Sequence, residues 1–538
     1  MNDFPWLSLT IWLPLAGVAV LMLLTPFTRR AEARRETGGE NGRGGEPASR
    51  GLSRDGLWRW GTLLATTATF AVSLVVLAEF DGSLSEFQLV ERARWVEVLN
   101  FQYLLGVDGI SLFMVLLTTF LLPLSVVASW KMQERVPYFM ASLLILETAM
   151  LGTFVSLDLL LFFVFFEGML FPMYLLIGVW GYEQRVYAAV KFLIYTMAGS
   201  ALLLVAILFL YFRAGTELGQ VTFDLTSLQG LDLPVVTSRW LFLAFFLAFA
   251  VKVPLFPLHT WLPDAHTEAP TAGSVLLAGV LLKIGAYGLI RFNLGLFPEA
   301  SDFFRELILA LAVVGILYGA IVALIQRDVK RLVAYSSVSH LGFVVLGIFV
   351  GTAQGMSGGV VQMVNHGLST GALFLLVGML YDRLHTRDLA RMGGLANRIP
   401  IYAGFFLVVA LSSIALPGLN GFVGEFLILA GAFFAERPFA IFAVGGVILS
   451  AIYLLWAYQR MMHGDVREDH GGVRDLSLRE IGVLVPVVGL IVAIGIYPKP
   501  LLDRIEPTAE RTAKVIETVR EPEPGPVAIP PEEQGEGG

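Results

Sequence analysis

Long apolar runs dominate this sequence, and short charged or Pro/Gly-rich segments separate them. Several runs reach the roughly 18 to 20 residues that an α-helix needs to cross the hydrocarbon core of a bilayer. The pattern predicts about 14 membrane-spanning helices. We place them at 9–26, 60–79, 109–130, 137–156, 158–180, 188–212, 239–258, 272–294, 305–325, 333–350, 360–382, 402–430, 437–460 and 480–497. The predicted fold class is an all-α polytopic membrane protein.

Two of these runs contain prolines and glycines that interrupt helices. Lys252-Val-Pro-Leu-Phe-Pro257 places two prolines beside a lysine, and Leu416-Pro-Gly-Leu-Asn-Gly421 precedes Glu425. We expect broken helices near residues 252–257 and 416–424, because proline removes a helical hydrogen bond and unwound backbone can line a polar cavity. Paired breaks are typical of transporters built from inverted repeats. We therefore predict two inverted five-helix repeats, at 137–294 and 305–460, after N-terminal spans within 1–136.

Three polar segments lie outside these repeats. Residues 28–59 form a Gly/Arg/Glu-rich loop that we predict to be disordered and cytoplasmic. Residues 461–504 contain another cytoplasmic loop and the last span, and residues 505–538 form an acidic Pro/Glu/Gly-rich tail that we also predict to be disordered.

Charge sets the orientation and excludes several functions. With alternate loops assigned to opposite sides, one side carries most of the 37 lysines and arginines, so we expect that side to be cytoplasmic and both termini to face outward. Only 15% of residues are charged, the net charge is −7, and no basic patch could follow the phosphates of a nucleic acid. The absence of cysteine excludes disulfides and Cys-ligated iron–sulfur clusters in this chain.

Ionisable residues inside the predicted spans carry the functional signal. A charge at the centre of a spanning helix costs about 2.5 to 3.5 kcal/mol on insertion scales, and such residues usually mark ion or proton pathways. The five residues are Glu147, Glu167, Lys252, Lys283 and Glu425. One interpretation is that Glu167 and Lys252 form a purely structural ion pair. The spread of five charges over five helices favours a proton relay instead.

His340 and His366 extend this set, since histidine titrates near neutrality and can pass a proton between its two nitrogens. The alternative is that each histidine is a hydrogen-bonded packing residue. The segment from His259 to Glu268 contains residue types that bind metals, but it lacks paired ligands at helical spacing, so we favour a loop packed under the broken span over a metal site.

With these residues identified, the chain resembles the antiporter-like, proton-pumping membrane subunits of respiratory complex I, and among them the subunit M type of bacterial NADH-quinone oxidoreductase. The resemblance runs from about Gly106 to Tyr458. Its most specific stretches are GVDGISLFMVLLT (106–118), FFEGMLFPMYLLIGVWG (165–181), KVPLFPLHTWLPDAHTEAPTAGSVLLAGVLLKIGAYGLIRF (252–292), RDVKRLVAYSSVSHLGF (327–343) and LPGLNGFVGEF (416–426). Sister subunits L and N typically carry lysine where this chain has Glu425, and this difference favours the M type.

The resemblance implies roles for the charged residues. Glu167 and Lys252 would be the coupling pair, Lys283 the central relay residue and Glu425 the exit-side proton site. His340 and His366 would lie between two half-channels, and Glu147 would join the relay.

The resemblance also implies a setting for the chain. It would act as a subunit of H+-translocating NADH:quinone oxidoreductase in the bacterial inner membrane, beside L-like and N-like subunits and the peripheral arm. FMN, iron–sulfur clusters and quinone would belong to partner subunits, with no redox centre, metal or nucleic acid in this chain. The alternatives are a subunit of a secondary Na+/H+ antiporter or of a membrane-bound hydrogenase, and a scaffold that does not pump.

Overall fold

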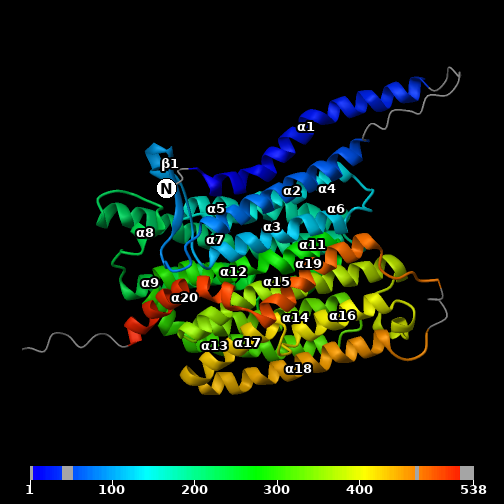
Figure 1. The fold of residues 1–538 in the computed structure, drawn as a ribbon. Helices are drawn as coiled ribbons and strands as arrows, with labels where there is room; N and C mark the ends of the chain where they lie inside the picture. Colours follow the sequence, from blue (N-terminus) through cyan, green and yellow to red (C-terminus); the bar gives the residue numbers. More distant parts are fainter. Residues whose placement is uncertain (1–3, 39–52, 467–471, 521–538) are drawn as a thin grey trace, which may run out of the picture.

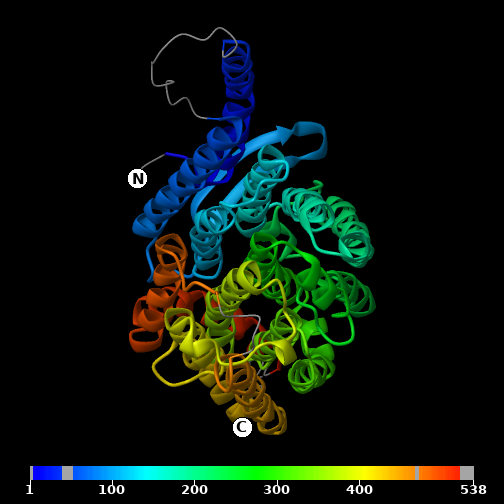
Figure 2. The ribbon, with the colours of Figure 1, turned by 90° about the vertical axis from the view of Figure 1, so that its right-hand side faces the viewer.

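Nearly parallel long helices make up most of the protein, seen along their length in Figure 1 and end-on in Figure 2. The computed structural model describes residues 4–38, 53–466 and 472–520. The long uninterrupted helices are α1 (Trp6–Gly38), α2 (Arg54–Glu79), α3 (Ser111–Ala128), α4 (Val136–Val155), α7 (Arg185–Glu217), α13 (Pro298–Leu324), α14 (Val329–Phe349), α15 (Ala353–Leu384), α18 (Arg437–Met462) and α19 (Leu478–Ile496).

The span count agrees with the sequence. Within the described ranges, thirteen helical segments are long and apolar enough to cross a membrane. The shorter apolar helices α16 (Pro400–Ser413) and α17 (Asn420–Ala435) add one interrupted span. The predicted class of all-α polytopic membrane protein is therefore confirmed, whereas the inverted relation between the two repeats stays a prediction.

Both predicted helix breaks are present. Helix α9 (Val235–Lys252) ends at the lysine, and the short α10 (Trp261–Glu268) begins after the two prolines. Helices α16 and α17 flank the second break, where Gly418 has a φ of 91°. Glycine adopts this left-handed conformation without a steric penalty, so the Pro-Gly pair ends one helix and allows the next to begin.

Two further spans are irregular in ways that the apolar pattern did not predict. The run 158–180 divides into α5 (Leu159–Gly168) and α6 (Leu170–Trp180), which separate at Met169, two residues after Glu167. The run 272–294 alternates α-helix with wider π-helical turns, as α11 (Thr271–Leu276), η2 (Leu277–Leu281), α12 (Leu282–Gly288) and η3 (Leu289–Leu294). Lys283 therefore lies between two π-helical segments, which are rare and frequently mark functional sites.

A β-hairpin is the main element that the sequence analysis missed. Strand β1 (Gln88–Val96), the turn η1 (Glu97–Leu99) and antiparallel β2 (Phe101–Val107) form it. The Glu91 carboxylate accepts hydrogen bonds from the backbone N–H groups of Leu7 and Ser8. The hairpin thus supplies acceptors for N–H groups in the first turn of α1, which have no partner within the helix. We call the end of the bundle that carries the hairpin, α8 (Leu225–Leu228) and α20 (Lys499–Arg520) the hairpin face; it lies at the left of Figure 1.

Two predictions of disorder are corrected. The tail prediction is wrong for residues 505–520, which belong to α20, because apolar residues recur there at helical spacing and are buried against the bundle. The loop prediction for 28–59 is wrong at both ends, since α1 continues to Gly38 and α2 begins at Arg54. The Ala, Arg and Glu residues after Arg29 are good helix formers. Residues 39–52 and 521–538 lie outside the described residues.

Candidate functional site

Lys283 and His366 meet at the centre of the bundle. Lys283 Nζ lies 2.7 Å from His366 Nδ1 and also donates to the carbonyl of Ala278 in the π-helical segment η2. Lys283 has no exposed surface, and His366 is 3% exposed. The two helices approach closely because a Cβ on Gly367 would lie 2.8 Å from the carbonyl oxygen of Gly279. Two glycines thus bring the lysine and the histidine into contact.

His340 and Glu425 form a second buried pair. His340 Nδ1 on α14 lies 2.8 Å from Glu425 Oε1 on α17, and the same carboxylate oxygen accepts Gln362 Nε2 at 3.0 Å. The hydroxyl oxygen of Tyr453 lies 3.5 Å from His340 Nε2. Glu425 Oε2 has no hydrogen-bond partner within the described part of the chain. This pair can share or transfer a proton directly.

The two pairs are adjacent. The ring centroids of His340 and His366 are 5.9 Å apart. A small cavity with polar walls borders both histidines and is lined also by Gln362, Asn365 and Ser369. A bridging water needs two to four polar partners, and these side chains offer them. Four residues predicted from the sequence, Lys283, His366, His340 and Glu425, are therefore brought together as one buried polar chain.

A polar network secures the second helix break beside this chain. Asn365 Nδ2 donates to the carbonyl of Asn420 at 2.6 Å, and Asn420 Nδ2 donates back to the Asn365 carbonyl at 3.3 Å. Ser412 Oγ donates to Asn420 Oδ1 at 2.5 Å. These hydrogen bonds join α15 to the first residue of α17 and to the end of α16.

Glu167 and Lys252 are near each other but not in an ion pair. No salt bridge within 4.0 Å joins them among the described residues. Lys252 Nζ, which has no hydrogen-bond partner there, lies 4.9 Å from the ring centroid of Phe166 and 5.6 Å from that of Phe192. The aromatic faces supply cation–π stabilisation in place of a carboxylate. Lys252 and Glu167 are therefore not in direct contact in this structure.

Glu147 stands apart from this group. It lies within α4, fully buried, and neither carboxylate oxygen has a hydrogen-bond partner among the residues that the structure describes. The structure therefore groups four of the seven predicted residues, leaves Glu167 and Lys252 as a loose pair, and leaves Glu147 unconnected.

Gln362, Asn365 and Asn420 are polar residues of the site that the sequence analysis did not name. Gln362 precedes His366 by four residues on α15, so the two lie on the same face of that helix. This four-residue spacing from His366 could have identified Gln362 from the sequence. Asn420 sits within the predicted break, and its amide could have been expected to bind unwound backbone.

Two acidic residues anchor the elements that carry the site on the hairpin face. Asp108 accepts the N–H groups of Ile110 and Ser111 at the start of α3, and its Oδ2 lies 2.6 Å from Arg291 Nη2 on η3. Asp158 accepts the N–H groups of Leu160 and Leu161 and so begins α5.

Asp158 also has an altered proton affinity. Burial raises the pKa of Asp158 to about 6, although the hydrogen bonds that its carboxylate accepts from backbone N–H groups lower this pKa. The nearby Asp224 carboxylate adds to the rise in this pKa. The start of the helix that carries Glu167 is therefore sensitive to pH.

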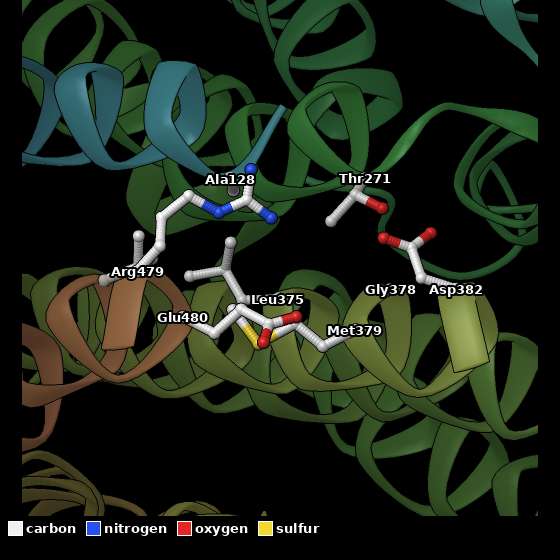
Figure 3. Close-up of a pocket in the computed structure, with 9 residues that line it drawn as sticks. Ala128, Thr271, Leu375, Gly378, Met379, Asp382, Arg479 and Glu480 are labelled. Atoms are coloured by element: carbon white, nitrogen blue, oxygen red, sulfur yellow. The ribbon is translucent and has the colours of Figure 1, made fainter. Parts of the chain in front are cut away.

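A separate polar pocket opens at the end of the bundle opposite the hairpin face. Figure 3 shows Asp382 of α15, Thr271 of α11 and Arg479 and Glu480 of α19 around it. Along α15, Asp382 is sixteen residues from His366, or about 24 Å at 1.5 Å per residue, so the pocket does not reach the buried polar chain.

The segment predicted to pack under the broken span forms α10 and its flanks. His266 is fully buried and stacks on Phe374, with ring centroids 4.6 Å apart. Within the described ranges, no group of three His, Cys, Asp or Glu residues could hold a metal ion.

The fold and the buried polar chain define a class of protein: multi-span membrane proteins that carry ionisable residues through the bilayer on interrupted helices. A family model described as "NADH:quinone oxidoreductase/Mrp antiporter, TM" matches residues 156–452. A second, for the amino terminus of NADH-ubiquinone oxidoreductase chain 4, matches residues 60–157. The chain belongs to the NADH-quinone oxidoreductase subunit M family.

Individual relatives agree with this assignment. NADH-quinone oxidoreductase subunit M of Rhodobacter capsulatus is 45% identical over 516 residues, which cover 93% of this chain and 95% of that protein. A chain of the Thermus thermophilus respiratory complex I, solved with bound NADH, is 33% identical with a TM-score of 0.82, covering 95% of this chain and 99% of that one. A chain of the Mrp complex of Dietzia sp. shares the fold at 19% identity, with a TM-score of 0.77 and coverage of 95% and 99%. The chain is accordingly a membrane subunit of NADH-quinone oxidoreductase.

Proposed function

We propose that this chain is a proton-translocating module of NADH:quinone oxidoreductase, driven by electron transfer from NADH to quinone in partner subunits. The observation that carries the proposal is the buried chain from Lys283 through His366 and His340 to Glu425. Such a chain is expensive to insert in a membrane, and packing alone does not require it.

The geometry supports a stepwise transfer. Lys283 can pass a proton to His366 Nδ1 across 2.7 Å, and an imidazole that gains a proton on one nitrogen can release one from the other. A water in the polar cavity or a small ring movement would connect His366 to His340. The contact of 2.8 Å between His340 and Glu425 completes the path to the exit-side carboxylate.

Glu167 and Lys252 would control this transfer through charge. At an effective dielectric near 20, increasing the separation of two unit charges from about 4 to about 8 Å changes their interaction by about 2 kcal/mol. A change of this size alters the proton occupancy of a nearby site more than tenfold. The separation of the two residues fits such a variable distance.

The setting follows from the family and the charge pattern. We infer a bacterial inner-membrane protein whose basic loops face the cytoplasm and whose termini face outward. FMN, iron–sulfur clusters and quinone would be held by partner subunits, and L-like and N-like subunits and the peripheral arm would be neighbours. Co-purification with flavin and iron–sulfur subunits distinguishes this assignment from a secondary Na+/H+ antiporter.

The test is Lys283→Arg in the intact complex. Arginine keeps the charge but cannot release a proton at accessible pH, so we expect normal assembly with most proton translocation and coupled quinone reduction lost. NADH-driven acidification of vesicles measures proton translocation, and NADH–ferricyanide activity checks assembly. Lys283→Met, which removes the charge at similar volume, should fail in the same way.

Lys191→Arg is the matched control, because Lys191 pairs with Asp264 at 2.7 Å and arginine can keep that contact. It should pump like the parent. If Lys283→Arg also pumps like the parent, the charge and not the proton of Lys283 matters, and the relay through this helix is wrong.

A further inference from the structure

A deep apolar groove opens on the side of the bundle between α2, α3, α15 and α19. Its volume is about 860 Å³, and its walls include Phe113 and Phe120 of α3 and Leu490 and Ile494 of α19. Leu368 of α15 lies in its floor. The size falls in the range of about 300 to 1,000 Å³ that small-molecule sites occupy.

The groove has the length of one membrane leaflet. On α19 it extends from Pro486 to Ile496, which lie ten positions apart, or about 15 Å along the helix. The hydrocarbon core of a bilayer is about 30 Å thick, so this length is half of it. The groove therefore begins near the middle of the membrane and ends at the hairpin face.

A single cationic side chain lies at the hairpin-face end. Arg504 of α20 is the one Lys, Arg, His, Asp or Glu residue among the described residues that line the groove. The backbone carbonyl of Arg504 packs directly against Gly109, where a Cβ atom would clash with it. Its Nη1 donates to the Pro500 carbonyl at 2.8 Å, and its buried Nε has no partner among the described residues. The remaining donors of the planar guanidinium suit a phosphate.

We propose that the groove is a binding site for a phospholipid of the leaflet at the hairpin face. The acyl chains lie between α3 and α19, and the phosphodiester binds Arg504. Apolar walls along one leaflet and a cation at the interface end match the order of groups in this lipid.

The site has a consequence for the interior. Leu368 and Val364 in the groove floor each lie two residues from His366 on α15. The bundle already buries both side chains, so bound acyl chains would add a second apolar layer over this part of α15. A low-dielectric surrounding strengthens electrostatic interactions, and the lysine–histidine contact lies directly behind these residues.

Photo-crosslinking in the intact complex tests the proposal. The complex is placed in vesicles of phosphatidylethanolamine and phosphatidylglycerol with a trace of phosphatidylglycerol bearing an acyl-chain diazirine, and labelled peptides are mapped by mass spectrometry. We expect labelling of α3 between Phe113 and Phe120 and of α19 around Leu490. A diacylglycerol with the same diazirine chain but no phosphate should label these peptides about tenfold less, since a charge-assisted hydrogen bond is lost.

Variants separate the two halves of the site. Arg504→Gln should reduce phospholipid labelling about tenfold, and Ala493→Trp should reduce it by filling the groove while Arg504 remains. Lys514→Ala, a cation on the same helix outside the groove, is the matched control and should label like the parent. Equal labelling by the two probes, or unchanged labelling in Arg504→Gln, would overturn the proposal. So would a cross-link from benzoylphenylalanine at position 490 to another subunit, which would identify the groove as a protein interface.

Discussion

His340 and Glu425 are 85 residues apart in the sequence, yet His340 Nδ1 lies 2.8 Å from Glu425 Oε1 in the centre of the bundle. Gln362 donates to the same carboxylate oxygen, so one oxygen of Glu425 is held by two side chains while the other has no partner among the described residues. Such an arrangement fixes the position of one carboxylate oxygen.

Glu425→Gln tests whether that proton matters. Glutamine keeps the size and hydrogen bonding of the side chain but does not ionise, so we expect proton translocation to fall about a hundredfold, within the range for loss of a general acid or base. Glu425→Asp should retain much of the activity. The measurement is the initial rate of NADH-driven vesicle acidification. Near-normal rates in both variants would show that Glu425 is structural.

Lys252→Ala should uncouple or stop pumping while membrane insertion survives. The lysine sits over the Phe166 ring and close enough to Glu167 to interact with it electrostatically, so the substitution removes the positive charge to which we assign control of the neighbouring sites. Acidification per NADH oxidised is the readout. Lys499→Ala, at an exposed lysine paired with Asp503, is the control and should behave like the parent. A Lys252→Ala complex that assembles and pumps normally would exclude the coupling role.

Asp158→Asn should stabilise the complex at alkaline but not at acidic pH. The folded pKa of about 6 exceeds the ordinary value of 3.8, so the folded protein holds this proton more tightly than the unfolded one. The stability that this group contributes is fully present below about pH 4 and decreases as the pH rises to about 6. Above pH 6 the total loss is up to about 3 kcal/mol. Asparagine has no such loss.

Thermal unfolding of the purified complex at pH 5 and pH 8 measures this difference. The gain from Asp158→Asn should be larger at pH 8. Asp81→Asn is the control, because hydrogen bonds from Ser83 lower the pKa of the exposed Asp81 and no gain is expected. An equal gain at both pH values would mean that ionisation of Asp158 is not the cause.

Asp108→Asn should destabilise the chain strongly. It leaves the buried Arg291 guanidinium without its charged partner, and breaking a buried pair in this way costs roughly 3 to 5 kcal/mol. The midpoint of thermal unfolding in mild detergent is the measurement. Arg92→Ala breaks a pair whose arginine side chain is 55% exposed and should have a small effect. If the double variant Asp108→Asn/Arg291→Met is no more stable than Asp108→Asn alone, the uncompensated charge is not the reason.

Much of the fold was readable because a bilayer imposes a length and a composition on each span. The breaks after Lys252 and before Asn420 were readable for a similar reason, since proline and glycine act on the backbone locally. The hairpin was not, because the apolar residues of β1 alternate only weakly with polar ones. Helix α20 was hidden by its charge and by Pro507, although Leu501, Ile505 and Ala509 recur every four residues. Packing against the bundle stabilises it, and packing is not visible in composition.

The site was predictable as a set of residues but not as a connected path. The free-energy cost of placing a charge inside the membrane identified Lys283 and Glu425 individually. Which of them meet depends on contacts between residues more than 80 positions apart, and on the close approach of Gly279 and Gly367. The separation of Glu167 from Lys252 likewise depends on aromatic side chains near the lysine, which no spacing rule reveals.

Helix α20 gives the bundle a mechanical property. Near its middle, Thr508 accepts the N–H of Gly109 just before α3, and its last residue, Arg520, lies 3.6 Å from Asp302 of α13 and 3.4 Å from Glu436. A buried apolar stripe runs along the helix. The helix therefore joins the α3 side of the hairpin face to α13, and a rotation of one half of the bundle against the other would break these contacts. We expect the working cycle to leave them intact and to use smaller movements, of side chains and of the two broken segments.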